Sequence, residues 1–130
     1  MSLGVNDLAR AKRFYDAALA PLGLVAHQQI PSEVGYGPPG EPPQEGYAFY
    51  IGFEDPAETR PVAPSAGYHV AFNAPSRQAV RDFHAAALGA GGRDRGAPGL
   101  RPRYHESYYG AFVIDPDGHH VEAVCHAPEE

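Results

Sequence analysis

An internal repeat is the feature of this sequence that most constrains its fold. Asp7 and Ser76, two residue types that favour the N-cap of a helix, stand 69 residues apart. Gly23 and Gly92, which are typical of helix ends, stand at the same interval. The apolar residues between cap and stop also match at helical spacing. Because a shared helical period alone would not reproduce the cap and the stop together, the sequence predicts two copies of one structural unit.

Each copy contains a strand, then the predicted helix, then further strands. In the first copy the strand patterns cover residues 2–5, 24–30 and 46–53, and the rest of residues 31–64, which contain eight prolines, is expected to be loop. In the second copy the strand patterns cover residues 67–73, 108–114 and 119–126. The last two are expected to form a hairpin, because Asp115-Pro116-Asp117-Gly118 places proline second and glycine last in a turn.

Neither copy can bury its apolar face alone, so the two are expected to share a core. We predict an α+β fold of two βαβββ modules, about residues 1–60 and 66–130, within one domain over residues 1–130. Their strands are expected to form one curved, mixed, eight-stranded sheet with both helices on its convex side.

Composition and charge exclude several classes of function. Ten Lys and Arg against sixteen Asp and Glu leave a net charge of −6, which disfavours nucleic acid and anionic membranes as partners. The single Cys125 excludes an intramolecular disulfide and a cysteine zinc site, and it fits a reducing compartment. The sequence has no long apolar run and no secretory leader pattern. A cytoplasmic protein without a membrane partner is therefore expected.

Three segments of the chain resemble the vicinal oxygen chelate superfamily of glyoxalases, bleomycin-resistance proteins, fosfomycin-resistance enzymes and extradiol dioxygenases. They are residues 2–8 followed by Phe14-Tyr15, residues 68–72, and residues 112–122 with their Asp-Pro-Asp-Gly turn. The superfamily uses one scaffold for isomerisation, addition, ring cleavage and sequestration. The resemblance thus implies the fold more specifically than the reaction.

The resemblance also implies a metal site with a His from the first strand, a His from the strand that opens the second module, and a Glu from the last strand. His69 and Glu122 match the second and third of these positions. Imidazole and carboxylate suit a divalent ion such as Zn, Ni, Mn or Fe and leave coordination positions for substrate. Strand alternation supports this assignment. Val70 and Val121 belong to the apolar faces that pack against the helices, so the side chains of His69 and Glu122 point to the opposite, concave side of the curved sheet, which we call the cup.

The resemblance places the remaining metal ligand, a His, on the first strand. Counting back one repeat interval of 69 residues from His69 gives the position immediately before Met1. We therefore expect that the native start lies further upstream and that the first-strand His precedes Met1. Without that His, a water or His120 would have to complete the site. Residues 47–53 contain no carboxylate or imidazole, which argues against the four-ligand site of lactoylglutathione lyases. Phe112 stands where the fosfomycin branch has a tyrosine.

Four arginines lie within residues 93–103, followed by tyrosines and a histidine. Arg103, Tyr104 and Tyr109 are candidates to bind a polar or anionic substrate at the mouth of the cup, and His105 is a candidate for proton transfer. The alternative is a solvated loop whose arginines balance a negative surface.

Two functions follow from these residues. The first is a metal-dependent enzyme of lyase, isomerase or dioxygenase type that acts on a small substrate with adjacent oxygens, with Glu122 as both ligand and proton carrier. The second is a metal-free binding protein of the bleomycin-resistance type, with Tyr47, Phe49, Tyr104 and Tyr109 lining the cup. A dimerisation scaffold is a third, weaker option. The resemblance implies a homodimer.

Overall fold

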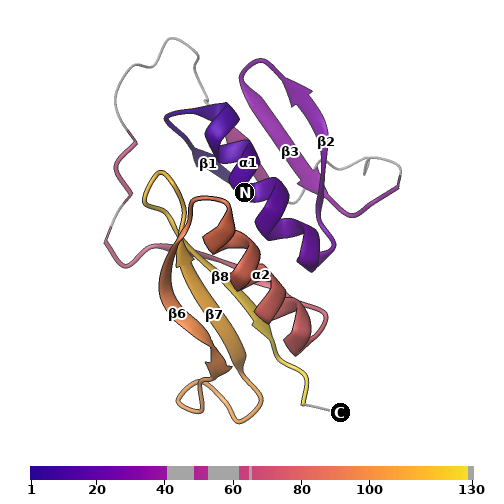
Figure 1. Ribbon diagram of the computed structural model, residues 1–130, viewed down its shortest axis with the longest axis vertical. Coiled ribbons are helices and arrows are strands. Elements are labelled where there is room, and N and C mark those ends of the chain that lie inside the picture. Colours follow the sequence, from indigo (N-terminus) through magenta and orange to yellow (C-terminus); the bar gives the residue numbers. More distant parts are fainter. Residues whose placement is uncertain (41–48, 53–61, 65, 129–130) are drawn as a thin grey trace.

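The structure is a computed structural model that describes residues 1–40, 49–52, 62–64 and 66–128. Its elements follow one another as β1 (Ser2–Gly4), α1 (Leu8–Leu19), a 3-10 turn (Ala20–Leu22), β2 (Val25–Ile30), β3 (Glu33–Gly37), β4 (Phe49–Gly52), β5 (His69–Asn73), α2 (Arg77–Gly89), β6 (Arg93–Leu100), β7 (Tyr109–Ile114) and β8 (His120–Cys125). Figure 1 shows the two halves of the chain, each with its helix lying across its own strands.

The strands form two sheets of four with the same internal order. The first sheet is ordered β1-β4-β3-β2 and the second β5-β8-β7-β6. In each sheet the first and last strands of the module pair in parallel, and the other pairs are antiparallel. The predicted α+β fold of two βαβββ modules is confirmed.

Both helix caps form as the repeat predicts. Asp7 accepts a hydrogen bond from the Arg10 amide, and Ser76 accepts one from the Ala79 amide, each at 3.0 Å. The helix ends differ between the modules. Gly23 ends the first helical segment with φ of 81°, whereas in the second module the left-handed residue is Gly91, at φ of 98°.

Two strands lie where the sequence predicted loop. β3 lies in the proline-rich stretch, and β6 covers most of the arginine-rich stretch. β6 is an edge strand whose pairing with β7 shifts register on both sides of Gly96, so it shows no regular apolar alternation. β3 contains Gly35 and Gly37, which weaken the sequence signal for a strand.

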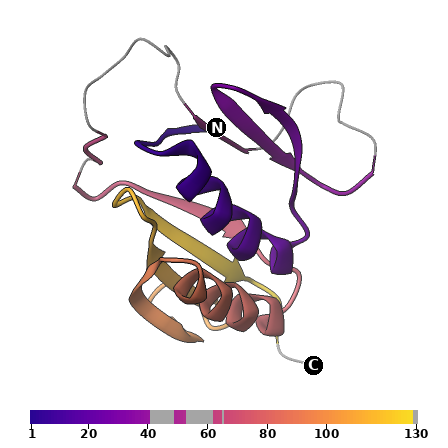
Figure 2. The same ribbon diagram turned by 45° about the horizontal axis from the view of Figure 1, so that its top comes forward.

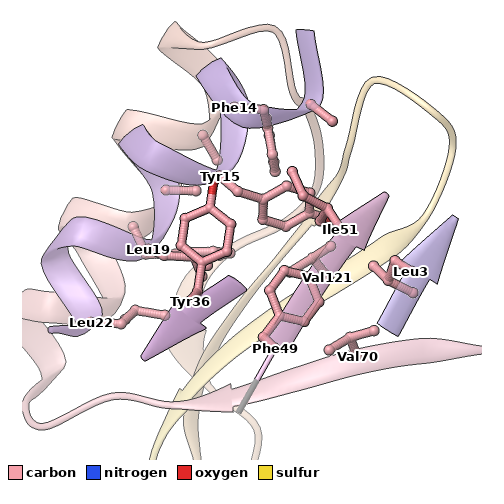
Figure 3. Close-up of a cluster of buried hydrophobic side chains, with 14 of the residues drawn as sticks. Leu3, Phe14, Tyr15, Leu19, Leu22, Tyr36, Phe49, Ile51, Val70 and Val121 are labelled. Carbon is pink, nitrogen blue, oxygen red and sulfur yellow. The ribbon is translucent and has the colours of Figure 1, made fainter. Parts of the chain in front are cut away.

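One buried cluster joins the two modules. Phe14, Tyr15 and Leu19 of α1 point down onto the strands, as Figure 3 shows. Phe49 of β4 meets Phe72 of β5 edge to face at 5.1 Å, which connects the two sheets. Figures 1 and 2 both show α1 beside α2 on the same side of the molecule. The site described below lies on the opposite face of the second sheet.

The hairpin turn between β7 and β8 also holds the two modules together. Asp117 accepts hydrogen bonds from the Asn6 amide at 2.9 Å and from the Arg10 guanidinium at 3.0 Å. His119 is buried, and its Nε2 lies 2.7 Å from the carbonyl oxygen of Gly4. In the part of the chain that the structure describes, no helix is long and apolar enough to cross a membrane.

Candidate functional site

Strand alternation brings His69 and Glu122 to one face of the second sheet. β5 and β8 run parallel, with His69 opposite His120 and the next outward residue, Ala71, opposite Glu122. The residues between them, Val70 and Val121, are buried on the helix side. The Nε2 atom of His69 lies 3.2 Å from Oε1 of Glu122. The predicted proximity of these two side chains is therefore present in the structure.

Glu122 is a buried carboxylate with a second partner. Its side chain is 2% exposed, and the Tyr108 hydroxyl donates a short hydrogen bond to Oε2. Burial, and then the hydrogen bond to the carboxylate, raise the pKa of Tyr108 above its ordinary value. The phenol thus stays protonated and remains a donor to Glu122 at neutral pH.

Gly110 provides the space for this hydrogen bond. A Cβ atom at Gly110 would lie 3.2 Å from Cε1 of Tyr108 and 3.3 Å from Oε2 of Glu122. Both distances are shorter than ordinary van der Waals contacts between such atoms. A side chain at this position would therefore press on the two groups that fix the carboxylate.

A pocket of about 440 Å³ opens beside His69, the candidate donor that contacts Glu122. Its lining is basic and aromatic, and includes His69, His120, Arg95, Arg101, Arg103 and Tyr104. Arg103 and Tyr104, both predicted to bind substrate, contact each other: the guanidinium donates to the phenol oxygen at 3.1 Å. No acidic residue is among the described residues that line the pocket, so its mouth attracts anions.

His105 lies beside the pocket and does not line it. Its Nε2 is 2.9 Å from Nδ1 of His126, and its Nδ1 accepts the Ser107 amide hydrogen at 3.1 Å. Its ring meets the Tyr108 ring edge to face at 5.4 Å. His105 is thus separated from Glu122 by the tyrosine, which does not favour its predicted direct role in proton transfer.

Two predicted lining residues occupy other places. Phe49 is 1% exposed and packs within the core on Tyr15, because β4 turns this residue to the helix side. Tyr109 also faces the helix: the guanidinium carbons of Arg77 and Arg81 lie 5.2 and 5.8 Å from its ring centre. The prediction that these two side chains line the cup is wrong. Tyr47 lies outside the described residues.

The first module has a tyrosine where the second has its buried carboxylate. Ser2 pairs with Tyr50 in the same way that Ala71 pairs with Glu122. Among the residues that the structure describes, no group of three His, Cys, Asp or Glu side chains converges. The described part of the chain therefore supplies two candidate metal donors, and the expected His before Met1 stays a prediction.

The two donors fit a single divalent ion. Bonds of about 2.0–2.2 Å to imidazole and carboxylate at a right angle would put the two donor atoms about 3 Å apart. The 3.2 Å between Nε2 of His69 and Oε1 of Glu122 agrees with neighbouring positions around one ion. Tyr108 would then orient the carboxylate from behind, as residues outside the ligand set commonly do.

Three residues of this site were not selected from the sequence. Phe112 pairs with Glu122 across β7 and β8, so strand register places it on the same face. Tyr108 follows from the same alternation, two residues before Gly110. Arg101 belongs to the group of four arginines that the sequence singles out, but nothing in the sequence distinguishes it from Arg103, because its position depends on the irregular pairing of β6 with β7.

Comparisons with known proteins agree with this fold. The model of the Glyoxalase/Bleomycin resistance protein/Dioxygenase superfamily matches residues 1–123. A glyoxalase/bleomycin resistance protein from Albidiferax ferrireducens is 31% identical, with a TM-score of 0.80 over 97% of this chain and 95% of that one. A glyoxalase-related enzyme from Fulvimarina pelagi is 20% identical, with a TM-score of 0.66 over 96% of this chain and 84% of that one.

The chain is also similar in structure to a mutant glyoxalase I from Zea mays. It is 21% identical, with a TM-score of 0.65 over 97% of this chain and 45% of that one. The comparison with curated proteins gave no match.

Proposed function

Because this chain belongs to the glyoxalase/bleomycin resistance protein/dioxygenase superfamily, we propose that it is a metal-dependent enzyme acting on a small substrate with adjacent oxygens. The observation that carries the proposal is the contact between His69 and Glu122 at 3.2 Å beside an open pocket. A buried carboxylate is costly unless it is paired, and this one contacts His69 through Oε1 and accepts a hydrogen bond from Tyr108 through Oε2. That arrangement suits a metal ligand.

The residues have distinct roles in this proposal. Nε2 of His69 and Oε1 of Glu122 would hold the ion, which would supply Lewis acidity to the substrate oxygens when bound. Tyr108 donates its hydrogen bond to Oε2 of Glu122 and so leaves Oε1 as the carboxylate oxygen beside His69. Oε1 of Glu122 would accept a proton from the substrate, while the Tyr108 hydroxyl holds the carboxyl group in place through Oε2.

Among the described residues, no third His, Cys, Asp or Glu side chain joins His69 and Glu122. The pocket is lined by residues of the second module, and by none of the described residues of the first module. We therefore propose a homodimer in which a second copy covers this face. Sedimentation velocity with and without metal tests this part: a dimer is expected, and a monomer that still binds metal stoichiometrically would contradict it.

The proposed metal site is tested by titrating metal-stripped protein with Zn²⁺, Ni²⁺, Mn²⁺ and, anaerobically, Fe²⁺ in a calorimeter. One ion per chain is expected, and both His69→Ala and Glu122→Gln are expected to weaken binding at least tenfold. His27→Ala is the matched control, because its imidazole lies on β2 of the first module, where its Nε2 contacts the carbonyl oxygen of Pro38. Unchanged affinity in both site variants would overturn the proposal.

The second candidate function is metal-free binding of a small molecule. One observation in its favour is that only two candidate metal ligands come together among the described residues. Another is that arginine and tyrosine side chains line the pocket. Thermal-shift screening with and without chelator separates the two functions. Ligands whose stabilising effect survives the chelator support a binding protein, and ligands whose effect disappears support the metal-dependent enzyme.

A further inference from the structure

Arg101 is fixed in position by the backbone around it. Its guanidinium donates to the carbonyl oxygen of Ala97 at 2.7 Å and to that of Leu100 at 3.5 Å. A Cβ atom at Gly96 would lie 3.3 Å from one terminal nitrogen, and a Cβ at Gly99 would lie 3.1 Å from the other. The two glycines therefore leave room for the guanidinium against β6.

The Phe112 ring neighbours both this guanidinium and the His69 ring. The Arg101 guanidinium carbon is 5.5 Å from the centre of the Phe112 ring, and the His69 ring centre is 6.5 Å from it. All three side chains line the same pocket. The pocket thus presents a cation, a flat apolar ring and the candidate metal donor His69 on one lining, with the Phe112 ring next to both of the others.

Arg101 differs from the other two arginines of the pocket. Arg95 and Arg103 are exposed, and Arg103 is hydrogen-bonded to the neighbouring Tyr104. Arg101 is half-buried and already ordered by two carbonyls and an aromatic face. An ordered guanidinium loses less side-chain entropy when it binds an anion, and it presents its fork in one orientation.

We propose that Arg101 determines the substrate class of this site by binding the anionic group of a molecule whose flat apolar body rests on Phe112. The far end of that molecule carries the oxygens that reach His69 and Glu122. This last statement rests on the proposed function, whereas the role of Arg101 and Phe112 does not depend on a bound metal. The predicted substrates are small planar carboxylates or molecules with a comparable anionic group.

The experiment compares benzoate with benzamide, two probes of the same shape that differ in charge. Binding is measured by NMR titration of metal-free protein in excess EDTA, up to 20 mM probe. Benzoate is expected to bind at least tenfold more tightly than benzamide, because a charge-assisted hydrogen bond exceeds a neutral one. Equal binding, or no binding of benzoate, would overturn the proposal.

Variants identify which arginine is responsible. Arg101→Gln is expected to abolish the preference for benzoate, and Arg101→Lys is expected to keep only part of it, since lysine retains the charge without the fork. Arg93→Gln, at an exposed arginine of β6 that does not line the pocket, is the matched control and is expected to keep the preference. A loss of preference in Arg93→Gln equal to that in Arg101→Gln would contradict the assignment. Backbone amide spectra establish that each variant is folded before titration.

The outcome also separates this inference from the proposed function. If the protein binds no metal but still prefers benzoate to benzamide through Arg101, the inference is supported and the proposed metal-dependent function is refuted. If metal binding depends on His69 but benzoate and benzamide bind with equal affinity, the proposed function is supported and the inference about Arg101 is refuted.

Discussion

The Tyr15 hydroxyl, on the helix of the first module, donates a 2.6 Å hydrogen bond to Oδ2 of Asp115 in the hairpin turn of the second module. Both residues are buried, at 0% and 2% exposed. The other oxygen of Asp115 accepts the amides of Asp117 and His119, each at 2.9 Å. One carboxylate therefore shapes the turn and also connects it to the first module.

Tyr15→Phe is expected to destabilise the protein by about 1–3 kcal/mol, because it leaves one oxygen of a buried carboxylate without its donor. Urea denaturation at pH 7 measures this change. Tyr50→Phe, in which the altered phenol is on a half-buried residue, is the comparison variant and is expected to cost less. An unchanged unfolding midpoint in Tyr15→Phe would contradict the role assigned to this hydrogen bond.

Alkaline pH is expected to weaken the folded state through the same tyrosine. Burial, and then the charge of Asp115, raise the pKa of Tyr15 well above its ordinary value. In the unfolded chain the phenol titrates near pH 10. Above that pH the unfolded state loses a proton that the folded state keeps, so the free energy of unfolding falls as pH rises. Urea midpoints between pH 9 and 11 should decline less steeply in Tyr15→Phe than in the wild type.

Gly92→Ala is expected to disrupt the contact between the two helices. A Cβ atom there would lie 2.6 Å from Cε1 of Phe14 and 2.8 Å from the Ala87 carbonyl oxygen, which is far inside contact distance. Overpacking of this kind costs about 1–3 kcal/mol. Gly89→Ala is the matched control: it lies at the end of α2 with open space around it, and it should be neutral or slightly stabilising. Equal thermal midpoints for the two variants would refute this account.

Tyr108→Phe is expected to weaken metal binding about tenfold while leaving the fold intact, because it removes the group that orients Glu122 and keeps the ring. The free Mn²⁺ signal in electron paramagnetic resonance reports the affinity directly. Tyr104→Phe, at an exposed phenol bonded to Arg103, serves as the control and should bind metal as the wild type does. Wild-type affinity in Tyr108→Phe would exclude a positioning role.

The fold was predictable because its signals are local. The caps at Asp7 and Ser76 and their common interval depend only on residue type and spacing, and both caps form. The contact between His69 and Glu122 was predictable because the family resemblance selects the two positions, and strand alternation then places both side chains on one face of the sheet. Strand β6 was missed because an irregular edge strand needs little apolar alternation.

Other parts of the site depend on contacts that sequence patterns do not encode. Phe49 was assigned to the cup because aromatic composition was read without the register of β4, which turns this residue into the core. Tyr108 and Arg101 were not selected, since the hydrogen bond of the first and the two glycines beside the second become visible only when distant segments are placed together.

The most direct test of the proposed metal site is the ¹⁵N spectrum of histidine-labelled protein during titration with Zn²⁺. The account predicts that the Nε2 resonance of His69 shifts by the amount typical of direct zinc coordination, and that Glu122→Gln removes this shift. His119, which is buried and has its Nε2 2.7 Å from the carbonyl oxygen of Gly4, serves as the internal reference and should not change. A spectrum in which His69 stays unshifted at saturating zinc would contradict the claim that His69 and Glu122 hold the metal.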